Sequence, residues 1–380
     1  MKICAIICEY NPFHNGHLWQ LRTARERAGA DAIVCIMSGN FVQRGESAIL
    51  DKYIRAKHAI QAGADAVIEL PTVFATANAE LFASGAIHIL SSIPSIKTLC
   101  FGAENAEKTA FKLAARYLSN EPQEVSLSIK KLVGEGVSYA KARAQAWAGF
   151  LPLDLLCSPN NILGVEYTKA ILTQNAQMDV LPLQRQGGGY LDATIHEDFS
   201  SATAIRNAID SNESVDGLLP EFVRVDLPKT TKNDLERLEK YAILSKPASE
   251  IAKVSDCTEG LENALKRVAE SDEPLVETLT SARYTSSRIR RIALQNLLNV
   301  EESLIRESLA SPLYLRILAV KKGQDEVLSA LSESAYPLLL RAHDDKKLSA
   351  VALQCYERDI FAEKVYALLY GKQKRETVFW

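Results

Sequence analysis

Short, nearly continuous apolar runs alternate with helical patterns over the first 220 residues of the chain. The apolar runs lie at residues 2–8, 32–37, 66–70, 96–101 and 180–183. Helical patterns separate them, for example at residues 18–28 and 51–62. A strand that is apolar on both faces is typical of a parallel sheet with helices on both sides. The alternation therefore predicts a doubly wound α/β sheet, in which ligands bind at the carboxyl ends of the strands.

The pattern changes near residue 220, and helical patterns predominate from there on. They cover residues 233–244, 261–269, 288–298, 312–321 and 350–370. The stretch at 223–246 is rich in charged residues and reads as a linker into the helical part. We therefore predict two domains: an α/β domain over residues 1–222 and a mostly helical domain over residues 223–380.

The composition is that of an ordinary globular protein, with 47% hydrophobic and 24% charged residues. The apolar runs are too short for a transmembrane helix, and the N-terminus lacks the basic region of a secretory signal. Seven cysteines are scattered without a C-x-x-C pair, which indicates neither a zinc site nor a disulfide framework. We therefore expect a cytoplasmic protein with no membrane partner.

Two histidines follow the first predicted strand: His14 and His17, separated by Asn15 and Gly16. If a helix begins there, both rings lie near its first turn, where free N–H groups and the helix dipole favour anions. Glycine lets a phosphate approach the backbone closely, and two imidazole donors suit the charge that develops on an α-phosphate. The pattern resembles the His-x-Gly-His motif of nucleotidyltransferases and class I aminoacyl-tRNA synthetases. Two surface histidines at a helix start are the alternative interpretation.

A second candidate for phosphate binding is the run at residues 200–206. It resembles a Ser-Ser-Thr-x-Ile-Arg run that opens a helix in the adenylate-forming superfamily and holds the β- and γ-phosphates. Ser201, Thr203 and Arg206 match that run, whereas Ala202 replaces a hydroxyl residue. An ordinary Ser or Thr helix cap is the alternative. Together the two motifs predict that His14, His17, Thr203 and Arg206 are catalytic and that Ser201 contacts ATP.

The net charge of −3 means that any RNA site must be a local cluster of cations. The densest cluster is at residues 283–291, and we predict that its four arginines bind RNA: Arg283, Arg288, Arg290 and Arg291. A solvated basic helix start is the alternative. Lys52 and Arg55 are one helical turn apart and are predicted to hold RNA phosphates, although exposed helix charge would also explain them.

Seven segments, in order along most of the chain, resemble the bacterial tRNA(Met) cytidine acetate ligases. They lie at residues 9–17, 37–46, 68–71, 101–104, 158–164, 201–206 and 284–291. The resemblance implies a HIGH-type nucleotidyltransferase domain and an enzyme that uses ATP to activate acetate as acetyl-adenylate. The acetyl group would then pass to N4 of the wobble cytidine of elongator tRNA(Met), giving N4-acetylcytidine.

The resemblance also implies which residues bind ATP. In this sequence they are Ile7, Cys8, Glu9, Tyr10, Asn11, Pro12, Phe13, His14, Asn15, Gly16, His17, Leu18, Trp19, Gln20, Gly102, Asn160 or Asn161, Arg185 and Gln186. Mg²⁺ is expected to be carried mainly by the phosphates of ATP, since the sequence shows no clear acidic metal cage.

Two other functions compete with this interpretation. A small-molecule adenylyltransferase, of the kind that makes a pantetheine or nicotinamide dinucleotide, would need no long helical half with an arginine cluster. An RNA-binding protein on an inactive nucleotidyltransferase fold would not need His14, His17, Thr203 and Arg206. The helical half with its arginine cluster and the presence of all four motif residues therefore favour the acetate ligase.

Overall fold

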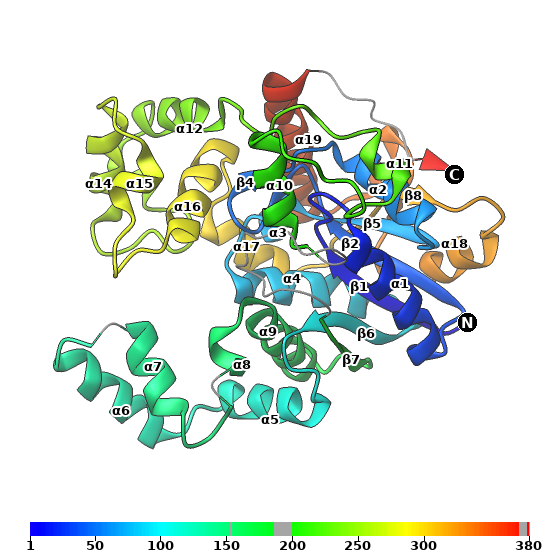
Figure 1. Ribbon diagram of the computed structural model, residues 1–380, viewed down its shortest axis with the longest axis horizontal. Coiled ribbons are helices and arrows are strands. Elements are labelled where there is room, and N and C mark those ends of the chain that lie inside the picture. Colours follow the sequence, from blue (N-terminus) through cyan, green and yellow to red (C-terminus); the bar gives the residue numbers. More distant parts are fainter. Residues whose placement is uncertain (138, 153, 186–199, 372–377, 380) are drawn as a thin grey trace.

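The computed structural model describes residues 1–137, 139–152, 154–185, 200–371 and 378–379. At its centre is an eight-stranded sheet with the order β10-β8-β5-β2-β1-β6-β7, in which β9 also pairs with β8 (Figure 1). The strands of this sheet are β1 (Ile3–Cys8), β2 (Ala32–Ser38), β5 (Ala66–Leu70), β6 (Ile96–Ala103), β7 (Asp179–Gln184), β8 (Leu315–Val320), β9 (Leu338–Leu339) and β10 (Val378–Phe379). Only the β5–β8 pair is antiparallel among the described strands of the sheet. The predicted α/β fold with a parallel sheet is confirmed.

Both faces of the sheet are buried, as the apolar runs predict. Ile3 and Ala5 of β1 belong to one hydrophobic cluster, whereas Cys4 and Ile6 belong to a second cluster on the opposite face. Successive side chains of a strand point to opposite faces, so a strand between two helical layers must be apolar at every position. This explains why the strands read as continuous apolar runs.

Helices cover the two faces unequally. The face with Cys4 is covered by α1 (Asn15–Ala28), α2 (Lys52–Gln61), α10 (Ala202–Asp210) and α11 (Glu221–Arg224). The cluster on the face with Ile3 includes residues of α3 (Thr72–Ala75), α4 (Ala79–Ser91), α5 (Lys108–Ser119), α6 (Gln123–Gly134), α7 (Tyr139–Trp147), α8 (Asp154–Cys157), α9 (Pro159–Thr173), α17 (Glu302–Leu309), α18 (Asp325–Ser332) and α19 (Ala350–Tyr370). Of these, α6 and α7 pair with each other and project away from the sheet (Figure 1). Among the described residues, no helix is long and apolar enough to cross a membrane.

A helical lobe with its own core stands beside the sheet (Figure 1). It contains α12 (Leu235–Leu244), α13 (Ala248–Ile251), α14 (Leu261–Ala269), α15 (Leu275–Leu279) and α16 (Ser286–Leu298). Leu265 of α14 and Ile292 of α16 are fully buried in this core. The helices predicted from the pattern at 233–244, 261–269 and 288–298 are thus present, each with small differences at its ends.

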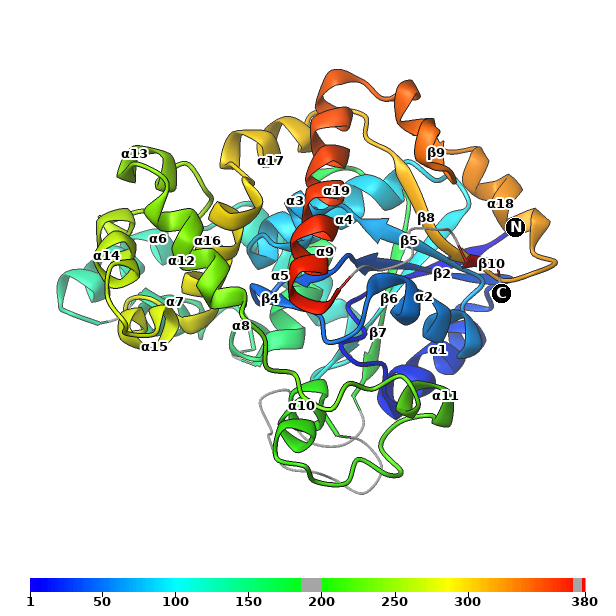
Figure 2. The ribbon, with the colours of Figure 1, turned by 90° about the horizontal axis from the view of Figure 1, so that it is seen from above.

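The helix predicted at residues 312–321 is wrong. This segment forms β8, which joins the sheet next to β5 and is buried along its whole length. A short apolar run has no periodicity that separates a buried strand from a buried helix. After β8 the chain forms α19, which packs next to α3 and α17 (Figure 2). The predicted boundary at residue 222 therefore does not divide the chain into two separate cores, because residues from 294 onward return to the core of the sheet.

The strand order places β1 at the point where the chain changes direction. The chain runs from β1 to β2 and β5 on one side, and then crosses to β6 and β7 on the other. In an open α/β sheet the crevice at such a point, outside the carboxyl ends of the strands, is the usual ligand site. The segment after β1, which carries both histidines, lies at this position.

Candidate functional site

A pocket opens at the carboxyl ends of β1 and β6, between α1, α10 and the small hairpin formed by β3 (Phe41–Val42) and β4 (Glu46–Ser47). Its lining comes from seven separate parts of the chain: Ile7, Cys8, Glu9, Tyr10, Asn11, His14, His17, Gln20, Val42, Gln43, Arg44, Glu46, Phe82, Phe101, Gly102, Asn160, Leu163, Tyr167, Arg185, Ser201, Ala202, Thr203 and Arg206. A smaller adjoining hollow adds Gly16, Trp19 and Ser200. The two predicted phosphate-binding motifs, nearly 190 residues apart in sequence, thus meet in one pocket.

Both histidines are held at the start of α1 by the backbone of that helix. The Nδ1 atom of His14 accepts the main-chain N–H of Gly16 at 3.1 Å, so His14 is the N-cap. The Nδ1 atom of His17 accepts the main-chain N–H of His14 at 3.2 Å. The two rings are stacked with their centroids 3.7 Å apart. Each imidazole therefore has a fixed orientation that does not depend on a ligand.

These contacts also determine where the ring protons lie. Burial, and secondarily the charge of Arg185, lowers the pKa of His14 to about 3. Burial and the neighbouring His14 lower the pKa of His17 as well. Both rings are therefore neutral at pH 7, and because Nδ1 is an acceptor, the single proton of each ring is on Nε2. Each histidine keeps one N–H donor for a ligand in the pocket.

The start of α10 supplies the opposite side of the pocket. The hydroxyl of Ser201 accepts the main-chain N–H of Ala204 at 3.0 Å and caps the helix. Arg206 donates to the main-chain oxygen of Asn11 at 2.7 Å, and Arg44 lies 3.4 Å from the hydroxyl of Thr203. Together with Arg185, these arginines bring three guanidinium groups to a pocket that also receives a helix N-terminus. Such a pocket is suited to a polyphosphate.

Some residues predicted to bind ATP lie elsewhere. Phe13 is fully buried in the core, and Leu18 packs against the same core. The side chain of Asn15 donates to the main-chain oxygen of Gly217. Neither hollow is lined by these three residues or by Pro12, which follows a cis peptide bond. These four residues therefore stabilise the conformation of the segment between β1 and α1 and do not face the pocket.

Of the two asparagines, the structure places Asn160 in the pocket. Asn161 is fully buried, accepts the main-chain N–H of Asn105 at 3.1 Å and donates to the main-chain oxygen of Asp154. The prediction of Asn161 as the alternative ATP contact is therefore wrong, because both ends of its amide are used inside the protein. Gln186, the remaining predicted contact, lies outside the described residues.

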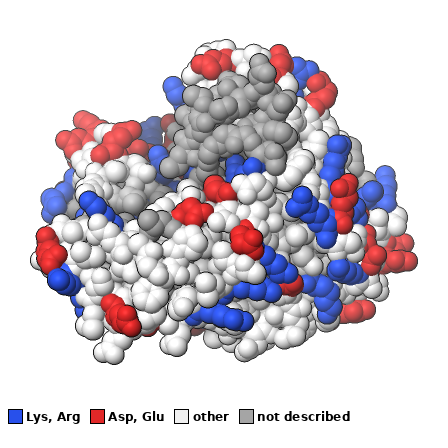
Figure 3. All heavy atoms as spheres, turned by 60° about the horizontal axis from the view of Figure 1, so that its bottom comes forward, with Lys and Arg blue, Asp and Glu red and all other residues white. Residues whose placement is uncertain are grey.

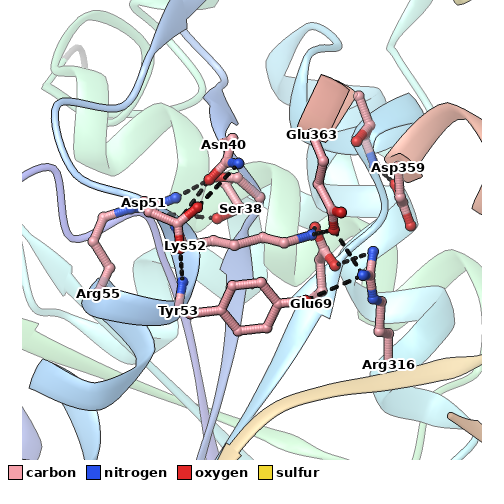
Figure 4. Close-up of polar contacts among 12 residues, drawn as sticks. Ser38, Asn40, Asp51, Lys52, Tyr53, Arg55, Glu69, Arg316, Asp359 and Glu363 are labelled. Carbon is pink, nitrogen blue, oxygen red and sulfur yellow. Dashed lines mark hydrogen bonds and ion pairs between the residues drawn. The ribbon is translucent and has the colours of Figure 1, made fainter. Parts of the chain in front are cut away.

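The prediction that Lys52 and Arg55 bind RNA is also wrong, because both side chains are buried (Figure 4). Lys52 forms ion pairs with Glu69 at 2.5 Å and Glu363 at 2.6 Å, and Arg316 pairs with the same two carboxylates. Arg55 donates to main-chain oxygens at the ends of β1 and β2, among them that of Glu9 at 2.5 Å. Because Lys52 and Arg55 are one helical turn apart, both lie on the inner face of α2. There Glu69 of β5 and Glu363 of α19 neutralise the charge of Lys52.

The predicted RNA-binding arginines differ in exposure. The side chain of Arg283 is 65% exposed and that of Arg290 is 38% exposed. Arg288 lies over the ring of Tyr284, with its guanidinium carbon 5.1 Å from the ring centroid, and donates to the main-chain oxygen of Asp256. Arg291 is only 12% exposed and pairs with Asp256. Arg291 is therefore held mainly inside the protein, and the predicted RNA-binding cluster reduces to Arg283, Arg288 and Arg290.

The surface charge is mixed rather than uniform (Figure 3). On the face shown in Figure 3, basic and acidic side chains are interspersed. This matches the net charge of −3. Affinity for a polyanion would therefore depend on a few well-placed cations.

Several pocket residues have no counterpart among the predicted site residues. The hairpin residues Gln43, Arg44 and Glu46 follow β2 in a segment rich in glycine and polar residues. That composition, at the carboxyl end of a strand, could have indicated a ligand-binding loop. Gly45 in this hairpin has a φ of +78°, and a Cβ there would lie 2.5 Å from the main-chain nitrogen of Arg291. Phe82 and Tyr167 come from helices, where an aromatic residue in the pocket cannot be distinguished by sequence from one in the core. These aromatic side chains give one end of the pocket an apolar wall.

Among the described residues, no group of three or more His, Cys, Asp or Glu side chains is placed to hold a metal ion. All seven cysteines are free. The pocket therefore offers hydrogen-bond donors and guanidinium groups to a ligand, with two carboxylates, Glu9 and Glu46, among its described lining.

Comparison with known proteins agrees with this geometry. The HIGH Nucleotidyl Transferase family matches residues 1–378. The tRNA(Met) cytidine acetate ligases of Acetivibrio thermocellus and Clostridium perfringens are each 35% identical to the chain, over 97% of its length and 95% and 96% of theirs. The crystal structure of Thermotoga maritima TmcAL matches with a TM-score of 0.90 and 29% identity, over 100% of this chain and 99% of that one. TmcAL bound with alpha-thio ATP matches with a TM-score of 0.85 and 30% identity, over 97% and 94% of the chains.

Proposed function

The chain belongs to the HIGH nucleotidyl transferase family, together with the tRNA(Met) cytidine acetate ligases, and we propose that it is an ATP-dependent ligase of that kind. The observation that carries the proposal is the meeting of two motifs in one pocket. His14 and His17 offer Nε2 donors from the start of α1, and Thr203 and Arg206 face them from α10. The structural relative that holds alpha-thio ATP supports ATP as the co-substrate.

In the first step acetate attacks the α-phosphorus of ATP, and pyrophosphate leaves. The bond between the α- and β-phosphates breaks, and a new bond joins an acetate oxygen to the α-phosphorus, giving acetyl-adenylate. The two neutral histidines stabilise the charge that develops on the α-phosphate, while Thr203 and Arg206 hold the leaving pyrophosphate. Neither histidine needs to act as a nucleophile, so catalysis rests on positioning and electrostatics.

In the second step the acetyl group passes to N4 of the wobble cytidine of elongator tRNA(Met). Arg283, Arg288 and Arg290 on and before α16 are the proposed RNA contacts. Mg²⁺ is proposed to arrive with ATP, bound to its phosphates. Because ATP and tRNA are the proposed substrates, we place the enzyme in the cytoplasm.

The direct test is to incubate the purified protein with ATP, labelled acetate and a tRNA(Met) transcript, and then to analyse the nucleosides. We expect labelled N4-acetylcytidine together with AMP and pyrophosphate. A matched transcript with uridine in place of the wobble cytidine should remain unlabelled. Acetate-independent formation of a dinucleotide from ATP and phosphopantetheine or nicotinamide mononucleotide would instead support the small-molecule adenylyltransferase.

A further inference from the structure

The second step of the proposed reaction must release a proton. The N4 amine attacks the carbonyl carbon of acetyl-adenylate, a C–N bond forms, and the bond between that carbon and the phosphate oxygen breaks as AMP leaves. The attacking nitrogen becomes an amide nitrogen and loses one of its protons. A base within reach of the amine would accelerate this step, typically by 10²–10⁴-fold.

The histidines of the pocket are poorly suited to take this proton. The only ring nitrogen without a proton in each neutral imidazole is Nδ1, and it already accepts a main-chain N–H in both His14 and His17. Burial also lowers the pKa of both rings, which disfavours the protonated form. The candidates among the described lining residues are therefore the two carboxylates, Glu9 and Glu46.

The two carboxylates have different surroundings. Glu46 is held by two guanidinium groups, with Arg290 at 3.0 Å and Arg206 at 3.8 Å. Glu9 accepts the main-chain N–H of Gln43 through Oε1 at 2.7 Å, and in the described part of the chain no hydrogen-bond donor reaches its Oε2. Glu46 is therefore neutralised within the protein, whereas Glu9 keeps one oxygen for a substrate.

Glu9 is also rigidly positioned. It directly follows β1, and its main-chain oxygen accepts a bond of 2.5 Å from the buried Arg55. Arg55 also donates to the main-chain oxygens of Ser38 and Leu50, so one buried guanidinium holds the backbone at Glu9 against two neighbouring segments. A general base must hold its carboxylate at a defined distance from the amine, and this wall provides that support.

We propose that Glu9 is a catalytic residue of the acetyl-transfer step: its Oε2 accepts a hydrogen bond from the N4 amine of the cytidine and takes the proton that this amine loses. The proton then passes to solvent as AMP and the acetylated RNA leave. This inference rests on the proposed function. Carboxylates are suitable acceptors for the exocyclic amine of cytosine, so the same contact would also help to select cytidine.

The electrostatic surroundings of Glu9 support this role. Burial raises its pKa, while Gln43, Arg44, Arg206 and Arg55 act in the opposite direction. The other titratable groups that line the pocket are Cys8, Tyr10, His14, His17, Glu46, Tyr167 and Arg185. A carboxylate whose pKa is above the usual glutamate range is a better proton acceptor near neutral pH than an exposed one.

The test separates the two steps. Enzyme is first allowed to form acetyl-adenylate from ATP and labelled acetate, tRNA(Met) transcript is then added, and single-turnover transfer is followed as a function of pH. For the wild type we expect a rate constant that rises with pH and levels off, with an apparent pKa above the ordinary glutamate value. Glu9→Gln should lower the plateau ~100-fold and remove the rising limb. Glu9→Asp should retain the limb with a lower plateau.

Glu46→Gln is the matched control, since it also removes one carboxylate from the pocket but should keep the rising limb. The proposal is overturned if Glu9→Gln transfers acetyl at the wild-type rate, or if it is slow but keeps the wild-type pH profile, which would indicate a structural role. A wild-type rate that does not change with pH would overturn it even if Glu9→Gln fails to fold. Absence of acetylcytidine with the wild type would instead contradict the proposed function itself.

Discussion

Arg290 of α16 forms a 3.0 Å ion pair with Glu46 at the wall of the pocket. The same carboxylate lies 3.8 Å from Arg206, which belongs to the proposed phosphate site. Gly45 of the hairpin packs against the backbone of α16 so closely that a side chain there would collide with it. The helix proposed to bind RNA therefore contacts the wall of the pocket in which acetate would be activated, and no linker separates the two sites.

In His14 and His17 the Nδ1 atom accepts a main-chain N–H at the start of α1, and the Nε2–H remains as a donor to the ligand. A substitution that keeps the acceptor and removes the donor tests these two roles separately. An asparagine side chain can replace Nδ1 as an acceptor, but it carries no donor at the position of Nε2. We therefore expect His14→Asn and His17→Asn each to slow acetyl-adenylate formation by ~10²–10³-fold, about 3–4 kcal/mol, as for a lost oxyanion donor. The measurement is acetate-dependent release of pyrophosphate from ATP.

His343→Asn is the control for this series, because His343 is exposed in the 3₁₀ helix η1 (Ala342–Lys347) and does not line the pocket. His14→Ala and His17→Ala should be at least as slow as the asparagine variants, since they lose the cap as well. Near-normal pyrophosphate release by both asparagine variants would show that the histidines only shape the start of α1.

Lys52 gives a prediction that distinguishes a structural cation from an RNA contact. Lys52→Met leaves Glu69 and Glu363 without one of their two shared cations. Breaking a buried ion pair by removing one partner costs about 3–5 kcal/mol, so we expect a loss of this size in the free energy of unfolding, measured by urea denaturation. For the folded variant, the salt dependence of tRNA binding should equal that of the wild type. A decrease in that slope by ~1 would indicate a lost phosphate contact instead.

Glu239 of α12 makes the stability of the helical lobe depend on pH. Burial first, and then the neighbouring Glu236, raise the pKa of Glu239 from 4.5 to about 8, while Arg290 acts in the opposite direction. The folded protein therefore binds a proton that the unfolded chain releases, and between these two pH values stability falls as the pH rises. The full slope for one proton is about 1.4 kcal/mol per pH unit.

Glu239→Gln should remove this dependence. We expect the variant to melt at nearly the same temperature as the wild type at pH 5 and at a higher temperature at pH 8. Glu270→Gln, at an exposed position of the same lobe, is the control and should show no such difference. An equal shift of Glu239→Gln at both pH values would mean that Glu239 is already ionised in the folded protein.

The sequence predicted the sheet well because its strands are buried on both faces and therefore read as separate apolar runs. It predicted β8 wrongly, since six apolar-rich residues between helices carry no signal for pairing with β5, more than 240 residues earlier in the chain. The site followed from local motifs: His14, His17, Thr203 and Arg206 all line the pocket. Lys52 and Asn161 were misassigned because periodicity locates a polar residue on a helix but does not identify its partner. Those partners, Glu363 and Asn105, come from distant segments.

The last prediction concerns the RNA surface. The side chains of Arg283 and Arg290 are 65% and 38% exposed, and each pairs with a single carboxylate, Glu259 or Glu46. Such exposed pairs are weak, so an RNA phosphate can replace the carboxylate. The double variant Arg283→Ala and Arg290→Ala should bind tRNA(Met) more weakly. If both arginines contact phosphates, its log–log salt slope should fall by roughly 1.4–1.8, from 0.7–0.9 per contact.

The single variants should then separate binding from chemistry. Arg283→Ala should leave tRNA-independent acetyl-adenylate formation as in the wild type, because Arg283 has no contact with the pocket. Arg290→Ala should slow it several-fold, since Glu46 would be left to Arg206 alone and would compete with the phosphates for that guanidinium. Arg306→Ala is the control for charge, because Arg306 of α17 is 68% exposed and pairs only with Glu302 among the described residues. If the double variant keeps the wild-type salt slope while Arg306→Ala lowers it, the RNA lies on the side of α17 and not on α16.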